Sequence, residues 1–188
     1  DKQLAHRILQ KQIEAYLPRV EKYLEAVGDY VQIIQVNDDL GFQNGPLISP
    51  PLYREMIKPY HKQLWGFIKE KSKKPILLHS CGSIYQLIPD LIEIGVDALN
   101  PVQVSAANMD SKKLKKEFGK DITFWGGGCD TQNVLGTATP QQVRQEVRKR
   151  VNDFADEGGF VFTQVHNIQA NVPPENILAM YEELAQHS

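Results

Sequence analysis

The sequence predicts an α/β fold of the TIM type, the (β/α)8 barrel, with about five of its eight strands. Short apolar segments alternate with longer amphipathic segments along the whole chain, which is typical of parallel strands joined by helices. The strand segments end in glycine and polar residues, as barrel strands do where their loops begin. At 188 residues the chain is shorter than the usual barrel of about 250. We therefore expect one domain, residues 1–188, that forms the carboxyl-terminal portion of a barrel.

The predicted elements of the amino-terminal half follow from periodicity and from helix-capping residues. They are a helix over residues 4–27, a strand over 31–36, a loop over 37–48, a helix from 49 to about 71 and a strand over 76–79. Gly28 ends the first helix. Ser49 and Pro50 begin the second, because serine caps a helix and proline fits its first turn.

The carboxyl-terminal half repeats the alternation. It contains helices over 83–94, 110–118, 139–155 and 174–186, and strands over 97–100, 122–125 and 160–165. Gly95 and Gly119 end two of these helices, and Thr139 with Gln142 predicts a capping box at the start of another. The bare edges of the resulting sheet need a partner. We expect it to be the missing strands of a longer parent protein or a second copy of the chain.

Composition excludes several classes of protein. A net charge of −2 and a pI near 6.2 give no general attraction to nucleic acid or to an anionic membrane. The basic run at residues 112–116 is typical of a solvated helix face. No segment resembles a transmembrane helix or a signal peptide, so we expect a cytoplasmic protein in which the two cysteines bind metal or stay free.

His79 and Cys81 predict a metal site. They end the apolar run 75–78, and side chains two apart in a strand project to the same side. A thiolate beside an imidazole suits zinc better than magnesium or calcium. On this pair alone, a core histidine and a buried cysteine remain the simpler interpretation.

Two further residues at strand ends strengthen the metal hypothesis. Cys129 follows the strand at 122–125, and His166 ends the strand at 160–165. A catalytic zinc normally has three protein ligands and one open position, so Cys129 and His166 compete for the third place. We assign Cys129 as that ligand, which gives a two-thiolate site, and His166 as a catalytic acid, base or hydrogen-bond donor beside the metal.

Four motifs resemble those of one known superfamily. They are Asp38-Asp-Leu-Gly-Phe-Gln43 with Ser49-Pro50, His79-Ser-Cys-Gly82, the segment 126–132, and the segment 166–176. The chain resembles the carboxyl-terminal half of the uroporphyrinogen decarboxylase superfamily, which includes the haem-pathway decarboxylase and zinc-dependent, cobalamin-linked methyltransferases. The methyltransferases bind zinc through His-x-Cys at the sixth strand and a cysteine at the eighth. Here His79 and Cys81 match that pair, whereas His166 stands at the eighth strand, as in the decarboxylase branch.

The resemblance implies a zinc-dependent methyltransferase that exchanges a methyl group between a small molecule or a thiol and a corrinoid protein, with the direction of transfer open. Asp39 is expected to carry protons or orient substrate, and Asp38, Gln43 and Gln132 to contact it. A purely structural role, in which both aspartates cap the loop by hydrogen bonding to its backbone, is an equally good interpretation. The alternatives are a metal-free tetrapyrrole decarboxylase and a non-catalytic barrel fragment.

Overall fold

The strands of the main sheet lie side by side in the order in which they occur in the sequence. In the computed structural model, which describes residues 1–187, five parallel strands pair as β1-β4-β5-β6-β7. Their bounds are β1 (Ile34–Asn37), β4 (Ile76–His79), β5 (Ala98–Asn100), β6 (Thr123–Trp125) and β7 (Phe160–Val161). Each strand lies beside the next in this order without reversal, so the predicted partial barrel is confirmed over a doubly wound sheet. Ser188, the last residue of the predicted domain, lies outside the described residues.

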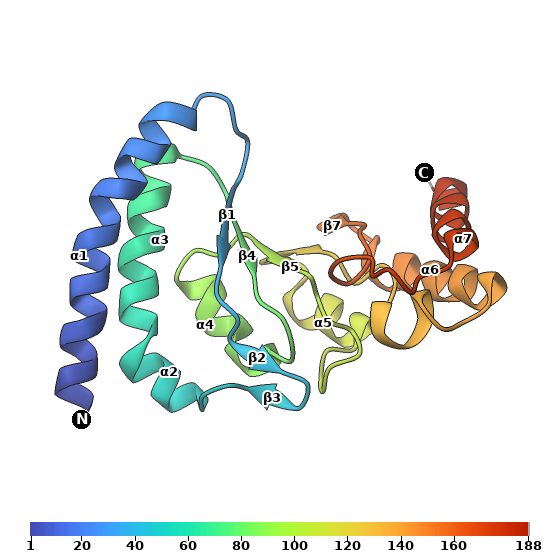
Figure 1. Ribbon diagram of the computed structural model, residues 1–188, viewed down its shortest axis with the longest axis horizontal. Helices are drawn as coiled ribbons and strands as arrows, with labels where there is room; N and C mark the ends of the chain where they lie inside the picture. The colour runs from blue at the N-terminus through green and yellow to red at the C-terminus, as the bar shows by residue number, and fades with distance from the viewer. Residues whose placement is uncertain (188) are drawn as a thin grey trace.

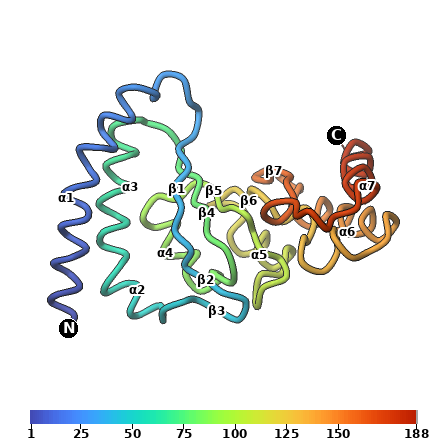
Figure 2. Tube along the Cα trace, viewed as in Figure 1, coloured from blue at the N-terminus to red at the C-terminus, as the bar shows by residue number. Residues whose placement is uncertain are grey.

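Helices connect the strands and follow the curve of the sheet, from α1 and α3 at one end to α6 and α7 at the other (Figure 1). They are α1 (Lys2–Val27), α2 (Pro50–Met56), α3 (Lys58–Ser72), α4 (Ile88–Glu93), α5 (Ser111–Phe118), α6 (Pro140–Phe154) and α7 (Pro174–Leu184). The trace in Figure 2 places α1 and α7 at opposite sides of the molecule. None of the helices in residues 1–187 combines the length and the apolar character needed to cross a membrane.

The strand expected at 31–36 is shifted to Ile34–Asn37, and three other elements differ from the sequence prediction in continuity or kind. The helix expected from residue 49 to about 71 is broken at Ile57 into α2 and α3, because Pro59 occupies the first turn of α3 and disfavours helix before it. The helix expected at 83–94 begins with a 3-10 turn, Tyr85–Leu87. The strand expected at 160–165 pairs over two residues only, followed by a single bridge between Cys129 and Gln164. By contrast, the capping box at Thr139 is confirmed.

The loop expected at 37–48 contains a hairpin that packs against the loop carrying Cys81. Its strands are β2 (Gly41–Phe42) and β3 (Gly45–Pro46). A Cβ at Gly41 would lie 2.9 Å from the carbonyl oxygen of Cys81, and one at Gly82, whose φ is +79°, would lie 2.5 Å from the Gly41 carbonyl carbon. Only glycine at both positions allows this approach. The hairpin therefore holds the Cys81 loop from one side.

Two apolar clusters support the sheet. The larger one packs the strand residues Ile76, Leu78 and Phe124 with helix residues such as Trp65. The smaller one lies among residues of α6, α7 and the loop after β6, around Val143. The alternate strand residues Gln35, Asn37, His79 and Asn100 line the opposite, polar side of the sheet, where the candidate site lies.

Candidate metal centre

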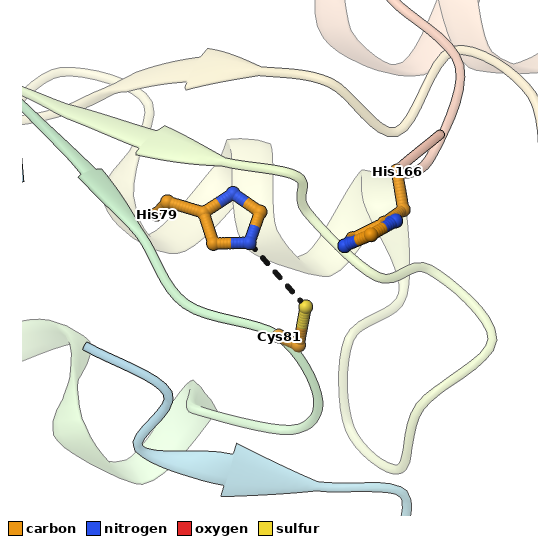
Figure 3. A group of neighbouring side chains, drawn as sticks. All are labelled: His79, Cys81 and His166. Carbon is orange, nitrogen blue, oxygen red and sulfur yellow. Dashed lines mark hydrogen bonds between the residues drawn. The ribbon is translucent and has the colours of Figure 1, made fainter. Parts of the chain in front are cut away.

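His79, Cys81 and His166 converge at the carboxyl end of the sheet. His79 ends β4, Cys81 lies in the loop after it, and His166 lies in the loop after β7, and the three side chains point toward one another (Figure 3). One possible ligand atom from each lies within 4.8 Å of the others. Within residues 1–187 this is the one group of three or more such side chains close enough to hold an ion.

The orientation of the His79 ring is fixed by its neighbours. Asn100 donates from Nδ2 to the carbonyl oxygen of Trp125 at 3.0 Å, so its Oδ1 faces His79 Nδ1, 2.6 Å away. An amide oxygen only accepts, so Nδ1 of His79 carries the hydrogen. The other nitrogen, Nε2, then presents a lone pair to the centre of the group. This arrangement is how ligand histidines are held in metal sites.

Cys81 lies next to that lone pair. Its Sγ is 3.6 Å from His79 Nε2, and its backbone N–H donates to Oδ1 of Asp39 at 2.8 Å. Burial raises the pKa of the Cys81 thiol to about 11, and the Asp39 carboxylate adds to the rise. Without a metal the thiol is therefore protonated near neutral pH, so an ion that binds here must displace its proton.

His166 approaches the pair from the loop after β7. Its ring centroid is 5.5 Å from that of His79, with the rings edge to face. Its backbone has φ of +62°, a left-handed conformation that few non-glycine residues adopt. Such outliers persist where the surrounding structure holds them and are common at functional sites. The fold thus holds an exposed imidazole over His79 and Cys81.

The three donors fit a zinc ion. Zinc prefers nitrogen and sulfur ligands at about 2.0–2.1 Å and 2.3 Å. In a tetrahedral site these lengths place sulfur and nitrogen about 3.6 Å apart, which agrees with the 3.6 Å between Cys81 Sγ and His79 Nε2. Three protein ligands leave a fourth position for a reacting molecule. The group is a poor binding site for calcium or magnesium, because these ions need oxygen ligands.

The structure does not bring Cys129 to this group, which corrects the two-thiolate prediction. Cys129 is fully buried in the smaller apolar cluster, and burial raises its thiol pKa to about 12, with Glu146 and Asp130 adding to the rise and Arg150 opposing it. The glycines before it explain the placement. A Cβ at Gly128 would lie 2.4 Å from the Phe162 ring, so this loop packs closely on the β7 segment. His166, rather than Cys129, lies beside His79 and Cys81.

The two aspartates serve different contacts. Asp39 accepts from the backbone N–H of Cys81 and so holds the loop that carries this candidate ligand. Asp38 faces α3, where its Oδ2 lies 2.8 Å from His61 Nε2, and His61 Nδ1 lies 3.1 Å from the hydroxyl of Tyr53. Asp38 therefore fixes the end of β1 to a helix, and it lines two cavities whose walls do not include the His79 group. This contact does not favour the substrate role predicted for it.

The two glutamines belong to a network that joins the loops. Gln103 donates to Gln43 at 2.9 Å and accepts from the backbone N–H of Gly82 at 2.8 Å. Gln43 donates in turn to the carbonyl oxygen of Ser105 at 2.6 Å. Gln132 accepts from the Ser105 hydroxyl at 3.0 Å and lines a cavity beside Cys81 and His166. Gln132 is thus positioned to contact a ligand, whereas Gln43 supports the loop that carries Gly82.

Two adjoining cavities, of about 510 and 370 Å3, share His166 in their walls. Their linings together comprise eight carboxamides, two threonines, one valine and the three candidate ligands; Asp, Glu, Lys and Arg are absent from them among the described residues. We call them the carboxamide pocket, lined by Gln35, Asn37, His79, Cys81, Asn100, Gln103, Thr131, Gln132, Thr163, Gln164, Val165, His166, Asn167 and Gln169. Asn37 and Asn100 were not predicted as site residues, although Asn100, like His79, ends a predicted strand and Asn37 directly follows one.

Comparison with known proteins decides the family. The family model described as uroporphyrinogen decarboxylase (URO-D) matches residues 1–187. The chain belongs to the uroporphyrinogen decarboxylase family. The family resemblance of the four motifs is thereby confirmed.

Individual relatives are distant and about twice as long. The chain is 26% identical over 188 residues to uroporphyrinogen decarboxylase from Chlorobaculum tepidum, covering 98% of this chain and 50% of the relative. It is 28% identical over 192 residues to the decarboxylase from Chlorobium limicola, covering 99% and 50%. A methyltransferase from Methanosarcina mazei has the same fold, with a TM-score of 0.71, 18% identity and coverage of 97% and 49%. These relatives are named as enzymes, and the chain spans about half the length of each.

Proposed function

We propose that this chain is the zinc-binding part of a methyltransferase that moves a methyl group between a small molecule or a thiol and a corrinoid carried by a separate protein. The observation that carries the proposal is the convergence of His79, Cys81 and His166, with the His79 lone pair directed by Asn100. Zinc held there would supply Lewis acidity at its fourth position, stabilising negative charge on the atom that gains or loses the methyl group.

The residues of this chain would contribute binding and orientation. Asn100 keeps Nδ1 of His79 protonated, and Asp39 holds the backbone of Cys81. In either direction the methyl group leaves without the electron pair of its old bond. That pair stays on the atom left behind, oxygen, nitrogen, sulfur or cobalt, and the attacking atom supplies the pair of the new bond. His166 is proposed as the third ligand, so the acid–base role predicted for it is not needed.

The alternative, a tetrapyrrole decarboxylase, is favoured by the names of the relatives, all at low identity. A substrate with many carboxylates calls for cationic partners, and the carboxamide pocket has none among the described residues. Within this chain, which spans about half the length of these relatives, the pocket therefore gives the decarboxylase hypothesis no ion-pair partner for a substrate carboxylate.

The zinc content of the purified protein, measured by elemental analysis, tests the proposal. We expect about one zinc per chain in the wild type and its loss in His166→Ala. His6→Ala is the matched control, because His6 is an imidazole on α1 bonded to Tyr60, and it should keep the metal. A folded, metal-supplemented protein without zinc that converts a uroporphyrinogen would overturn the proposal in favour of the decarboxylase.

A further inference from the structure

The segment 126–132 carries one of the four motifs, yet it contributes no side chain to the candidate metal centre. We propose that this segment positions His166. The hydroxyl of Thr131, through its hydrogen bond to the carbonyl oxygen of Val165, holds the His166 imidazole over the other two candidate ligands. Thr131 is thus a positioning residue that acts through His166. The inference rests on the proposed function in one respect, because it takes His166 as a metal ligand.

Hydrogen bonds tie this segment to the chain that leads into His166. The backbone N–H groups of Gly126 and Gly128 donate, at 3.0 and 2.8 Å, to two carbonyl oxygens that lie two residues apart in the segment beginning with β7. This is the regular spacing of a parallel ladder. The next carbonyl oxygen in the series, that of Val165, accepts from a side chain, the Thr131 hydroxyl, at 2.5 Å. A threonine side chain therefore takes over where the ladder ends, next to His166.

The peptide groups on both sides of His166 are hydrogen-bonded. The Val165 carbonyl that Thr131 bonds belongs to the peptide group that enters His166, and the N–H of Val165 donates to the carbonyl oxygen of Cys129 at 2.8 Å. On the other side, Nε2 of Gln164 donates to the His166 carbonyl oxygen at 3.0 Å. Because peptide groups are planar, fixing the two that flank a residue fixes its φ and ψ. These bonds therefore hold the φ of +62° at His166.

The position of Thr131 is set in turn by a π-helical turn, η2 (Thr131–Leu135). Asp130, which is buried, caps this turn. Its Oδ1 accepts from the N–H of Gln132 at 3.0 Å, and its carbonyl oxygen accepts from the N–H of Leu135 at 2.8 Å. Turns of this kind are rare and frequently lie at functional sites. The Thr131 hydroxyl is thus presented to Val165 from a backbone that is itself fixed.

Loss of the Thr131 hydroxyl would free the peptide group that enters His166. Histidine favours negative φ, and the exposed His166 side chain has little packing to resist a change of φ. Such a change would carry its imidazole away from His79, whose ring lies edge to face with it at a centroid distance of 5.5 Å. All of these groups lie within residues 1–187, so the clamp on His166 is complete within this chain.

Nuclear Overhauser contacts between the rings of His79 and His166 in the metal-free protein test the inference without zinc. We expect them in the wild type and in Thr131→Ser, which keeps the hydroxyl, and their loss in Thr131→Val, which has a similar shape without it. Thr137→Val is the matched control, because the Thr137 hydroxyl bonds the Asn133 carbonyl oxygen at 2.8 Å, and it should keep the contacts. Contacts that persist in folded Thr131→Val, or that are missing in the wild type, would overturn the inference. If Thr131→Val does not fold, Thr131→Ala makes the same test.

Zinc affinity, measured by competition with a chelator, tests the consequence for the metal. Thr131→Val should weaken zinc binding about 10–100-fold, as is usual for a residue that orients a ligand, and Thr131→Ser less than about threefold. Wild-type zinc affinity in a Thr131→Val protein that has lost the ring contacts would overturn the positioning role. A wild-type protein that binds no zinc, yet shows the expected ring contacts, would remove the proposed function and support the placement of His166 by Thr131.

Discussion

The loops after β4 and β6 each carry one of the two cysteines, and they place them in opposite environments. The loop after β4 lies against the hairpin β2–β3 and presents Cys81 to His79 and His166. The loop after β6 packs on Phe162 and turns Cys129 into an apolar cluster. A cysteine at the carboxyl end of a barrel strand is thus a candidate ligand only if its loop directs it to the polar side of the sheet.

The largest expected effect is on metal binding. Cys81→Ala should weaken zinc binding by about 100-fold or more, because it removes the soft ligand. Cys129→Ala should change it less than about threefold, since that thiol lies outside the group. Competition with a chromophoric chelator measures both. Loss of zinc in the Cys129 variant, with Cys81 intact, would reverse the comparison.

Removing the residue that orients the His79 ring is expected to have the next largest effect on zinc binding. Asn100→Leu removes the acceptor of the Nδ1 hydrogen and should weaken zinc binding about 10–100-fold, as is usual for a residue that orients a ligand. The same chelator competition measures it. Gln103→Leu is the matched control, because Gln103 is a carboxamide of the same pocket that bonds Gly82 and Gln43 rather than a ligand. Equal losses in the two variants would indicate a general effect on the loops.

Thiol reactivity distinguishes the two loops in the metal-free protein. The pKa of the Cys81 thiol is about 11, so its thiolate fraction, and with it the alkylation rate, should rise about tenfold per pH unit between about pH 7 and 9. Cys129 is fully buried and should react only when the protein unfolds. Mass spectrometry of labelled peptides reports both sites. Rapid labelling of Cys129 in the folded protein would contradict the burial described for it.

The smallest expected effect is on the free energy of unfolding. Here the Cys129 variant should be affected more than the Cys81 variant, the reverse of the order for zinc binding. Cys129→Ala leaves space in the smaller apolar cluster and should lower the free energy of unfolding by about 1–2 kcal/mol. Cys81→Ala, at a partly exposed position, should change it by about 0.5 kcal/mol or less in the metal-free protein. Urea denaturation of the two variants checks this. A larger loss for Cys81→Ala would mean that its loop stabilises the fold.

The sequence predicted the parts of the site that depend on one strand. The His79 and Cys81 pair could be predicted because side chains two residues apart at the end of a strand project to the same side. The order of the five strands could be predicted from the regular alternation of strands and helices. The sequence named Cys129 and His166 as candidates for the third member of the group but could not decide between them, because the choice depends on how two distant loops leave the sheet. The hairpin at Gly41 was missed although Asn44-Gly45 is a turn signal, because its strands are two residues each.

X-ray absorption at the zinc edge tests the central claim most directly, because it counts sulfur ligands. The account predicts one sulfur at about 2.3 Å and two imidazole nitrogens at about 2.0–2.1 Å, from Cys81, His79 and His166. Two sulfur ligands in the wild type, falling to one in Cys129→Ala, would contradict it and restore the two-thiolate site.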